Sequence, residues 1–387
     1  MAGLYIGNIQ SSATDFGKGS QRDLLDSITM VDAKETPFFS MAPKGSAPTN
    51  ALFEWPVDVN ETPGDNATAD GTDLGDSDYV AGAPTTSYDV MANRVQWFRR
   101  QAKIGKLAQN VQNQAGIKDH YAYSVTKKLL QLKRDAEVRF CSANVSQNTG
   151  SSLYYSAQVA ANTGSGSTTG NKTRGLGEFL NPATDETSHI PASYKTPADS
   201  VIGRYHNGSA WTGTDTQASA LTEANVETVL QSIYEQTGKT QSLTLLAGPN
   251  LKKRFKDFTQ TQFGSDATTA DASASSIRSY NADLKDKRII STVDVYEGDF
   301  GILELVPTLW NNYGFSGDGT GTIDDQASGR NSGCGYVIDW DLIEMRFNQL
   351  PQVTELPDLG GGRRFAVDLI AGLAVKSPLG MGAFFCR

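Results

Sequence analysis

Residues 119–142 read DHYAYSVTKKLLQLKRDAEVRFCS, and this stretch decides the fold. Its apolar residues recur at spacings of three and four, the period of an amphipathic helix with one buried face. At about 1.5 Å per residue the helix would be roughly 35 Å long. The apolar face consists of Tyr121, Val125, Leu129, Leu132, Ala136 and Phe140.

The opposite face of this helix is expected to be basic and solvated. Its cations are Lys127, Lys128, Lys133, Arg134 and Arg139. Glu137 follows Lys133 by four residues, a spacing that predicts an exposed ion pair worth only about 0.3 kcal/mol. The amphipathic pattern, rather than this pair, is therefore expected to order the helix.

Upstream of the helix, the chain reads as an arm followed by a long two-stranded loop. Residues 1–22 are polar, residues 23–28 (DLLDSI) form a short amphipathic turn, and Pro37 favours an extended chain around Phe38 and Phe39. Residues 52–57 and 94–98 alternate as strands do, and they bracket a tip rich in Gly, Asp, Thr and Pro. An extended arm with exposed phenylalanines is expected to need a partner.

Downstream, residues 143–220 show little pattern and predict inserted loops around the flexible run at 164–170. An α/β unit follows over 221–330, with a helix between Thr222 and Gly238, a buried strand at 242–247, a helix after Pro249 and two strands around the turn at 297–299. Alternating strands return after Tyr336. We expect these last strands to pack with the long helix as one discontinuous domain.

Composition indicates an assembling protein rather than one compact enzyme. The chain has 387 residues, enough for two or three domains, yet 38% are hydrophobic and 38 are glycine. Long polar loops cannot bury enough apolar surface to order themselves, so neighbouring chains are expected to hold them. The net charge of −9 disfavours a sequence-reading nucleic-acid protein but allows non-specific lining of a DNA container.

The cysteines and the N-terminal sequence indicate in which cellular compartment the protein is expected. Cys141, Cys334 and Cys386 are far apart and form no CxxC motif, which predicts unpaired, buried thiols in a reducing cytoplasm. Neither a signal peptide nor a run of 18 apolar residues is present, so we expect no export signal and no membrane partner.

The sequence matches none of the catalytic or ligand-binding motifs in full. We therefore expect no catalytic, cofactor or metal site, and we expect that the protein is not an enzyme. Gly238-Lys239-Thr240 lacks the earlier glycine of a phosphate-binding loop and reads better as a helix end. The acid-rich tip at 65–78 lacks the spacing of a calcium loop. The basic run at 252–256 could touch DNA, but a solvated helix face is the more common meaning of such a run.

Six short motifs stand in order along nearly the whole chain. They are residues 23–28 (DLLDSI), 35–38 (ETPF), 55–58 (WPVD), 133–137 (KRDAE), 175–176 (GL) and 295–301 (VYEGDFG). In this order they resemble the SU-ten-like family of tailed-bacteriophage major capsid (major head) proteins. The resemblance implies an α+β chain with the HK-ninety-seven-type capsid fold, which has an N-terminal arm, an E-loop, a P-domain with a long spine helix, and an A-domain.

The resemblance also assigns ranges and a role. It implies an arm at 1–50, an E-loop at 51–100, a P-domain with the spine helix at 101–146, a loop-rich connection or outward insertion at 147–220, an A-domain at 221–330, and returning P-domain and A-domain strands at 331–387. The implied function is structural: hexamers and pentamers of an icosahedral shell enclosing double-stranded phage DNA.

If the chain forms such a shell, its function depends on the contacts between subunits. Aromatic residues of the arm and loop are expected to be buried between chains, although burial in the chain's own core stays open for them; they are Phe38, Phe39, Trp55, Trp97 and Phe98. The acidic tip is expected to meet a neighbour's arginines, so that high salt loosens the shell. The charged candidates are Asp70, Asp73 and Asp76 on the tip, and Arg99, Arg100, Arg134, Arg363 and Arg364 opposite.

Other partners and other classes complete the expectations. No long charged helix precedes the arm, which favours a separate scaffolding protein, and a portal and a cement protein are further expected partners. The location would be the virion capsid, assembled in the host cytoplasm. An encapsulin-like nanocompartment shell, enclosing cargo enzymes instead of a genome, stays open. A non-assembling hydrolase or a module that binds carbohydrate or another ligand is supported only by the Gly/Ser/Thr-rich middle.

A non-covalent shell is the first testable expectation. Some shells of this fold are crosslinked from an E-loop lysine to a neighbour's asparagine, but this chain has no lysine between Lys44 and Lys103. Mature particles boiled in denaturant are therefore expected to run as a single monomer band on a gel. A ladder of multimers would contradict this.

Overall fold

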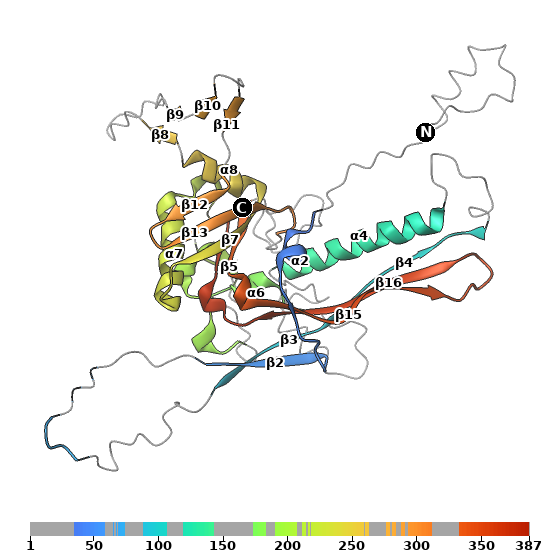
Figure 1. Ribbon diagram of the computed structural model, residues 1–387, viewed down its shortest axis with the longest axis horizontal. Helices are drawn as coiled ribbons and strands as arrows, with labels where there is room; N and C mark the ends of the chain where they lie inside the picture. Colours follow the sequence, from blue (N-terminus) through green and yellow to red (C-terminus); the bar gives the residue numbers. More distant parts are fainter. Residues whose placement is uncertain are drawn as a thin grey trace.

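The computed structural model describes residues 35–58, 65, 67, 69–73, 88–106, 119–142, 173–182, 190–206, 211–213, 216, 218–258, 260–262, 276–278, 281–283, 288–290, 293–311 and 333–386. The predicted turn at 23–28 and the flexible run at 164–170 lie outside these residues. Figure 1 shows two main bodies of structure, a long sheet beside a helix and a sheet with helices against it.

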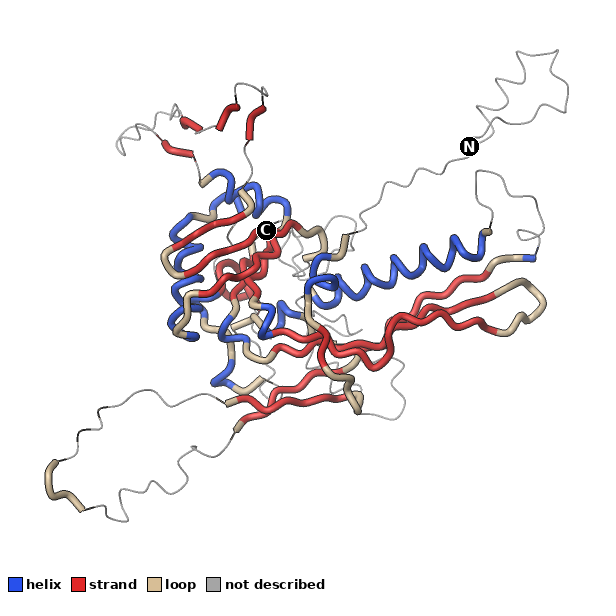
Figure 2. Tube along the Cα trace, in the orientation of Figure 1, coloured by secondary structure: helices blue, strands red, loops and turns tan. Residues whose placement is uncertain are grey.

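The long helix is present as α4, His120–Phe140, which confirms the prediction. Its N-terminus is capped by Asp119, whose side chain accepts hydrogen bonds from the N–H groups of Tyr121 and Ala122 at 2.8 and 3.3 Å. Leu132, Ala136 and Phe140 are fully buried, as the apolar spacing predicts. Figure 2 shows the helix running along the long sheet.

The long sheet has four strands in the order β1 (Lys44–Gly45), β15 (Ile343–Leu356), β16 (Arg364–Val375) and β4 (Gln96–Lys103). Helix α4 packs on one face of it. The Phe98 ring lies 6.1 Å from Phe140, and Tyr121 lies 5.2 Å from Phe365. The expected packing of the C-terminal strands with the long helix is therefore confirmed.

The sequence pattern predicted the first strand of the two-stranded loop correctly but pointed to the wrong second strand. Strand β2 (Leu52–Val57) pairs with β3 (Asp89–Arg94), whereas residues 96–100, placed in the E-loop from the sequence, begin β4 of the long sheet. Alternation continues across the junction at Val95, so it cannot show where one sheet ends. Gly372 lets this hairpin lie against β16, because a Cβ there would be 2.6 Å from the Phe53 ring.

The second sheet has seven strands in the order β12, β13, β7, β14, β17, β5, β6. Their bounds are Val295–Gly298, Gly301–Pro307, Gln241–Ala247, Cys334–Ile338, Gly382–Phe385, Val201–His206 and Trp211–Gly213. Strands β5 and β6 show that the segment predicted as loops also contributes two strands to this sheet, at residues 201–206 and 211–213.

Helices α7 (Glu223–Thr237) and α8 (Pro249–Asp257) pack with this second sheet. Thr222 caps α7 by accepting a hydrogen bond from the N–H of Asn225 at 3.3 Å. Gly238 ends the helix in the left-handed region at a φ of 65°, so it is the predicted helix stop.

The remaining elements are short. They are α6 (Leu176–Phe179), η2 (Ala192–Tyr194), η3 (Ala198–Ser200), η4 (Ala218–Ala220), η5 (Trp340–Leu342), η6 (Pro378–Gly380), β8 (Gln260–Gln262), β9 (Ser276–Arg278), β10 (Asn281–Asp283) and β11 (Arg288–Ile290). In the part of the chain that the structure describes, no helix is long and apolar enough to cross a membrane.

Two side-chain hydrogen bonds link the seven-stranded sheet to η5 and to the end of α4. The Trp340 Nε1–H donates to Thr244 Oγ1 of β7 at 2.9 Å, and the Tyr336 hydroxyl of β14 donates to the carbonyl of Cys141 at the end of α4 at 2.8 Å. Cys141, Cys334 and Cys386 are buried and unpaired, as predicted. Burial raises the pKa of each thiol.

The arm enters the fold through α2 (Pro37–Met41), which corrects the expectation that Pro37 holds this segment extended. Proline fits the first turn of a helix because its missing N–H would be unpaired there anyway. Thr36 before it keeps a non-helical backbone, with φ −130° and ψ 78°. Phe38 is fully buried, 6.2 Å from the Phe140 ring and 5.8 Å from Trp340.

Glu137 of α4 anchors this short helix, and the exposed pair predicted with Lys133 is wrong. The Glu137 carboxylate is fully buried and accepts hydrogen bonds from the N–H groups of Phe38 at 2.9 Å and Phe39 at 2.7 Å. These are the first donors of α2 after the proline. The side chain therefore binds the arm instead of a lysine on its own helix.

The buried carboxylate makes stability depend on pH. Burial raises the pKa of Glu137 from 4.5 to about 7, even though the two backbone donors oppose the shift. A raised folded-state pKa gives stability that is fully present below about pH 4.5 and lost as the pH rises through about 7. A shift of this size corresponds to a change on the order of 3 kcal/mol in unfolding free energy.

Glu137→Gln cannot ionise, so we expect it to flatten the loss of unfolding free energy between about pH 5 and about pH 8. Urea unfolding of the unassembled chain across this range measures the effect. Glu297→Gln, at an exposed position, serves as the control and should leave the slope unchanged. A slope that persists in Glu137→Gln would show that the buried carboxylate is not its source.

Candidate intersubunit surface

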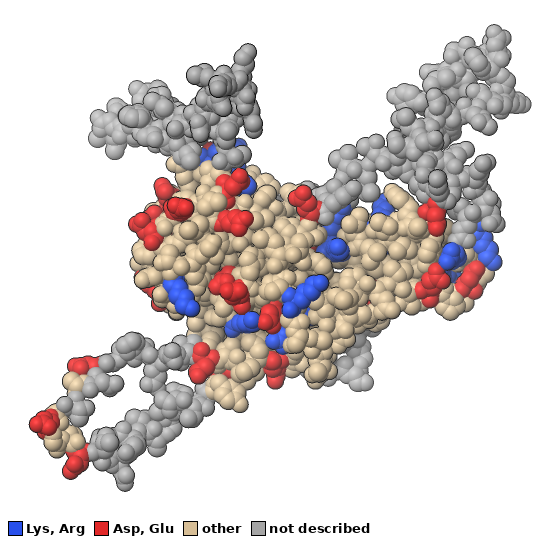
Figure 3. All heavy atoms as spheres, in the orientation of Figure 1, with Lys and Arg blue, Asp and Glu red and all other residues tan. Residues whose placement is uncertain are grey.

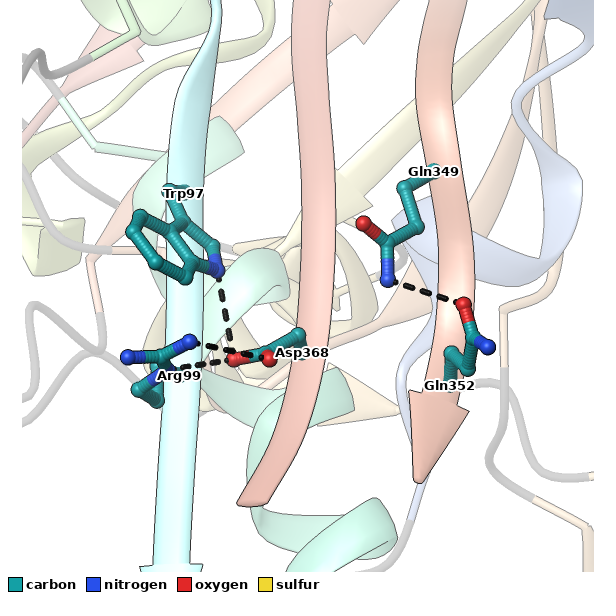
Figure 4. A network of polar contacts seen from close by, with 5 residues as sticks. All are labelled: Trp97, Arg99, Gln349, Gln352 and Asp368. Carbon is teal, nitrogen blue, oxygen red and sulfur yellow. Dashed lines mark hydrogen bonds and ion pairs between the residues drawn. The ribbon is translucent and has the colours of Figure 1, made fainter. Parts of the chain in front are cut away.

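The face of the long sheet that points away from α4 carries the candidate site. Side chains alternate along β4, so that Phe98 and Arg100 face the helix and Trp97 and Arg99 face the other way. The strand register places Asp368 of β16 between Arg99 and Gln352 of β15. Figure 4 shows these side chains lying across three strands.

Trp97, Arg99 and Asp368 form one connected group, here named the Trp97 cluster. Arg99 donates from Nε and Nη2 to the two carboxylate oxygens of Asp368, at 2.7 and 3.1 Å, and this raises the pKa of Arg99. The indole Nε1–H of Trp97 donates to the same carboxylate at 3.2 Å, and the guanidinium lies 3.9 Å from the Trp97 ring centre. The indole is therefore held on two sides.

Burial differs sharply within the Trp97 cluster. The Asp368 side chain is only 9% exposed, whereas Trp97 is 55% exposed. A large aromatic group that is already fixed in position loses little conformational freedom when a partner covers it. Exposed tryptophan and arginine are also the residues that most often dominate binding energy at interfaces. This arrangement suits contact with another protein surface.

Polar and apolar groups extend this surface across β15. Gln349 donates a hydrogen bond to Gln352 at 3.1 Å on the same face. Strand β1 pairs with β15 only at Met345 and Arg346, and beyond them Leu350 and Leu356 are 58% and 42% exposed. An edge strand with exposed leucines is a site where another chain commonly adds.

The predicted aromatic contacts divide into two groups. Phe38, Trp55 and Phe98 are 0%, 6% and 5% exposed and pack in the core of their own chain, which is the alternative that the sequence left open. Phe39 is half-buried, with its ring 5.8 Å from Phe347. Trp97 alone among the five presents most of its ring to a possible neighbour.

The predicted arginines are spread over β4, α4 and the start of β16 rather than gathered at one point. Arg100 pairs with Asp135 of α4 at 2.6 Å, and hydrogen bonding to Asp135 raises its pKa. Arg363 pairs with Glu355 at 2.8 Å. The Arg134 guanidinium lies 5.8 Å from the Trp310 ring centre. By strand alternation, Arg364 shares the open face with Arg99.

The acidic tip of the two-stranded loop is partly described. Asp70 lies within a turn that a hydrogen bond from the N–H of Thr72 to the carbonyl of Ala69 closes at 3.2 Å, and Asp73 directly follows this turn; both are exposed. Figure 3 shows acidic side chains at this tip. Asp76, the third predicted acid, lies outside the described residues.

Asp368 was not predicted as a site residue, although one feature of the sequence points to it. It is the one charged residue within the strongly apolar run of residues 365–375. Alternation alone would have placed it on one face with Ala366 and Ile370. The partner strand, which brings Arg99 opposite, is 269 residues away in sequence and could not be identified.

Comparisons with known proteins agree with this architecture. A family model described as SU10 major capsid protein matches residues 8–385. The fold is similar to that of the capsid protein of cyanophage P-SCSP1u, with a TM-score of 0.50 and 12% identity over 95% of this chain and 93% of that one. It is also similar to the capsid protein of a native GTA particle, with a TM-score of 0.53 and 9% identity over 97% and 99% of the two chains. No curated protein matches the chain.

The two arginine–aspartate pairs of β4 allow a matched stability test. Asp368→Asn removes a largely buried charge and is expected to lower the unfolding free energy by about 1 to 3 kcal/mol. Asp135→Asn breaks a pair whose side chains are 46% and 33% exposed, so we expect about 1 kcal/mol or less. Chemical denaturation of both variants measures the difference, and equal losses would contradict the special placement of Asp368.

Proposed function

Because the chain belongs to the SU10 major capsid protein family, it is a shell-forming protein of a phage virion, and we propose that it assembles as hexamers and pentamers around double-stranded DNA. The observation that supports this proposal most directly is the Trp97 cluster, which is exposed and already fixed in position. A large indole held by Asp368 and Arg99 yet 55% exposed is a contact prepared for a neighbouring copy.

The proposed occupant of this surface is the acidic loop of a neighbouring subunit. Asp70 and Asp73 belong to the described segment 69–73 between β2 and β3, and Figure 1 draws this coloured segment away from the two sheets. Arg99 and Arg364 supply positive charge on the open face. Such pairs at the rim of an interface set register more than affinity, and salt weakens them.

The proposal also includes the other components of the virion and the place of assembly. Shell assembly takes place in the host cytoplasm with a separate scaffolding protein, and a portal occupies one vertex. A cement protein reinforces the non-covalent contacts between subunits. The packaged DNA lies close to the shell without sequence-specific contacts, which the net charge of −9 supports.

Negative-stain electron microscopy paired with sedimentation tests the assembly. The chain is expressed alone and together with a candidate scaffolding protein. Closed shells, tubes or five- and six-membered rings are the expected products. A strict monomer in both preparations would remove the main physical basis of the proposal.

A matched pair of variants tests the surface itself. Arg99→Ala and Arg100→Ala alter neighbouring residues that face opposite sides of the same strand. We expect Trp97→Ala and Arg99→Ala to remain folded as single chains but to shift sedimentation from shells toward free subunits. Arg100→Ala, on the helix face, should assemble more nearly as the unaltered chain does. Equal assembly by all three variants would exclude the open face as a subunit contact.

A further inference from the structure

The β2–β3 hairpin is buried at its base and exposed at its outer end. Along β3, Met91, Ala92 and Asn93 are 0%, 4% and 0% exposed, although successive residues of a strand point to opposite faces. Asp89 and Val90, which lie nearer the loop, are exposed. The strand is therefore enclosed on both faces where it meets the rest of the chain, and it leaves this enclosure within a few residues.

Asn93 lies in the enclosed part and joins three segments that are far apart in the sequence. Its Nδ2 donates to the carbonyl of Leu373 in β16 at 2.5 Å and to the carbonyl of Arg174 at 3.2 Å. Its Oδ1 accepts a hydrogen bond from the N–H of Arg174 at 2.8 Å. One amide side chain thus bonds the hairpin both to the long sheet and to the segment that precedes α6.

This segment is itself held in place by Thr173, which is fully buried. The N–H of Thr173 donates to Gln96 Oε1 of β4 at 3.1 Å, and its hydroxyl oxygen accepts from the N–H of Leu373 at 3.3 Å. Its carbonyl accepts from Arg139 Nε of α4 at 2.9 Å. The segment to which Asn93 bonds is therefore fixed to the long sheet and to the long helix.

Apolar contacts also hold the base of the hairpin, but they are less selective for its direction. Phe53, which is opposite Asn93 in the strand register, fits against Gly372, and its ring stacks on Trp55 with 5.7 Å between the ring centres. The attraction between apolar surfaces is non-directional. Hydrogen bonds weaken steeply as their angle bends, so an amide bonded to two different segments favours one orientation.

We propose that Asn93 is a positioning residue of the two-stranded loop: through its bonds to Leu373 and Arg174 it fixes the direction in which β2 and β3 leave the long sheet. This direction is then a property of the single chain and is set before a neighbour binds. The consequence for assembly rests on the proposed function, in which the loop reaches a neighbouring subunit. A loop aimed in advance lowers the cost of that contact and restricts the angle between neighbours.

Distances between spin labels test the fixed direction in the unassembled full chain. One nitroxide pair joins Asp89→Cys, at the outer end of β3, to Gln101→Cys on β4, and a reference pair joins Gln101→Cys to Lys376→Cys, directly after β16. All three positions are exposed, and the native cysteines are buried. We expect equally narrow distance distributions for both pairs. A clearly broader distribution for the hairpin pair would overturn the proposal.

A matched pair of substitutions assigns the effect to Asn93. Asn93→Leu keeps a similar size but removes the donor and the acceptor, and we expect it to broaden the hairpin distribution about two-fold by local opening, with the reference pair unchanged. Asn311→Leu is the control, because Asn311 is also buried and donates from Nδ2 to two backbone carbonyls, at 2.8 and 3.2 Å, but in the seven-stranded sheet. An unchanged hairpin distribution in Asn93→Leu, or equal broadening in both variants, would overturn the proposal.

A second substitution covers the case in which leucine prevents folding. Asn93→Ser is smaller and keeps one hydroxyl donor, so we expect it to fold and to broaden the hairpin distribution in the same direction but less. Circular dichroism checks the fold of each variant before labelling. A folded Asn93→Ser chain with the narrow distribution of the unaltered chain would count against the role of the amide.

Particle size separates this inference from the proposed function. Shells of Asn93→Leu are expected to vary more in diameter than shells of the unaltered chain or of Asn311→Leu, as measured by negative-stain electron microscopy. Uniform Asn93→Leu shells of the usual diameter would overturn the consequence for assembly. If the unaltered chain formed no shells, the proposed function would fail, whereas the spin-label distances would still decide the role of Asn93.

Discussion

The buried carboxylate of Glu137 joins the N-terminal arm to the spine helix, and much of the chain's arrangement depends on it. Its two hydrogen bonds to the N–H groups of Phe38 and Phe39 satisfy both partners in a site without water contact. They hold Phe38 between Phe140 of α4 and Trp340, which in turn bonds to the seven-stranded sheet. Glu137 thereby joins the arm to the helix, and Phe38 continues this contact through Trp340 to the seven-stranded sheet.

The long sheet uses its two faces for different purposes. One face is closed by α4 with aromatic contacts such as Phe98 on Phe140, and it gives the chain a core of its own. The other face keeps Trp97 exposed but satisfies its N–H through Asp368, so that the indole is fixed without being buried. A shell subunit needs both properties, because it must fold before its neighbours arrive and then bind them.

Local signals in the sequence predicted the elements well, and long-range partners poorly. The spacing of Leu132, Ala136 and Phe140 located α4, and Thr222 and Gly238 marked the ends of α7, because these signals act within a few residues. Glu137 and Asp368 were misjudged or missed because their partners lie 98 or more residues away. For the same reason Trp55 and Phe98 could be named as aromatic contacts, but not assigned to the core.

A cryo-electron microscopy map of the assembled shell would test the central claim most directly, by showing what lies over Trp97. The account predicts that a neighbouring copy covers the indole and that acidic side chains of its loop lie near Arg99 and Arg364. A map in which Trp97 stays open to solvent in every subunit would contradict the assignment of this face to assembly.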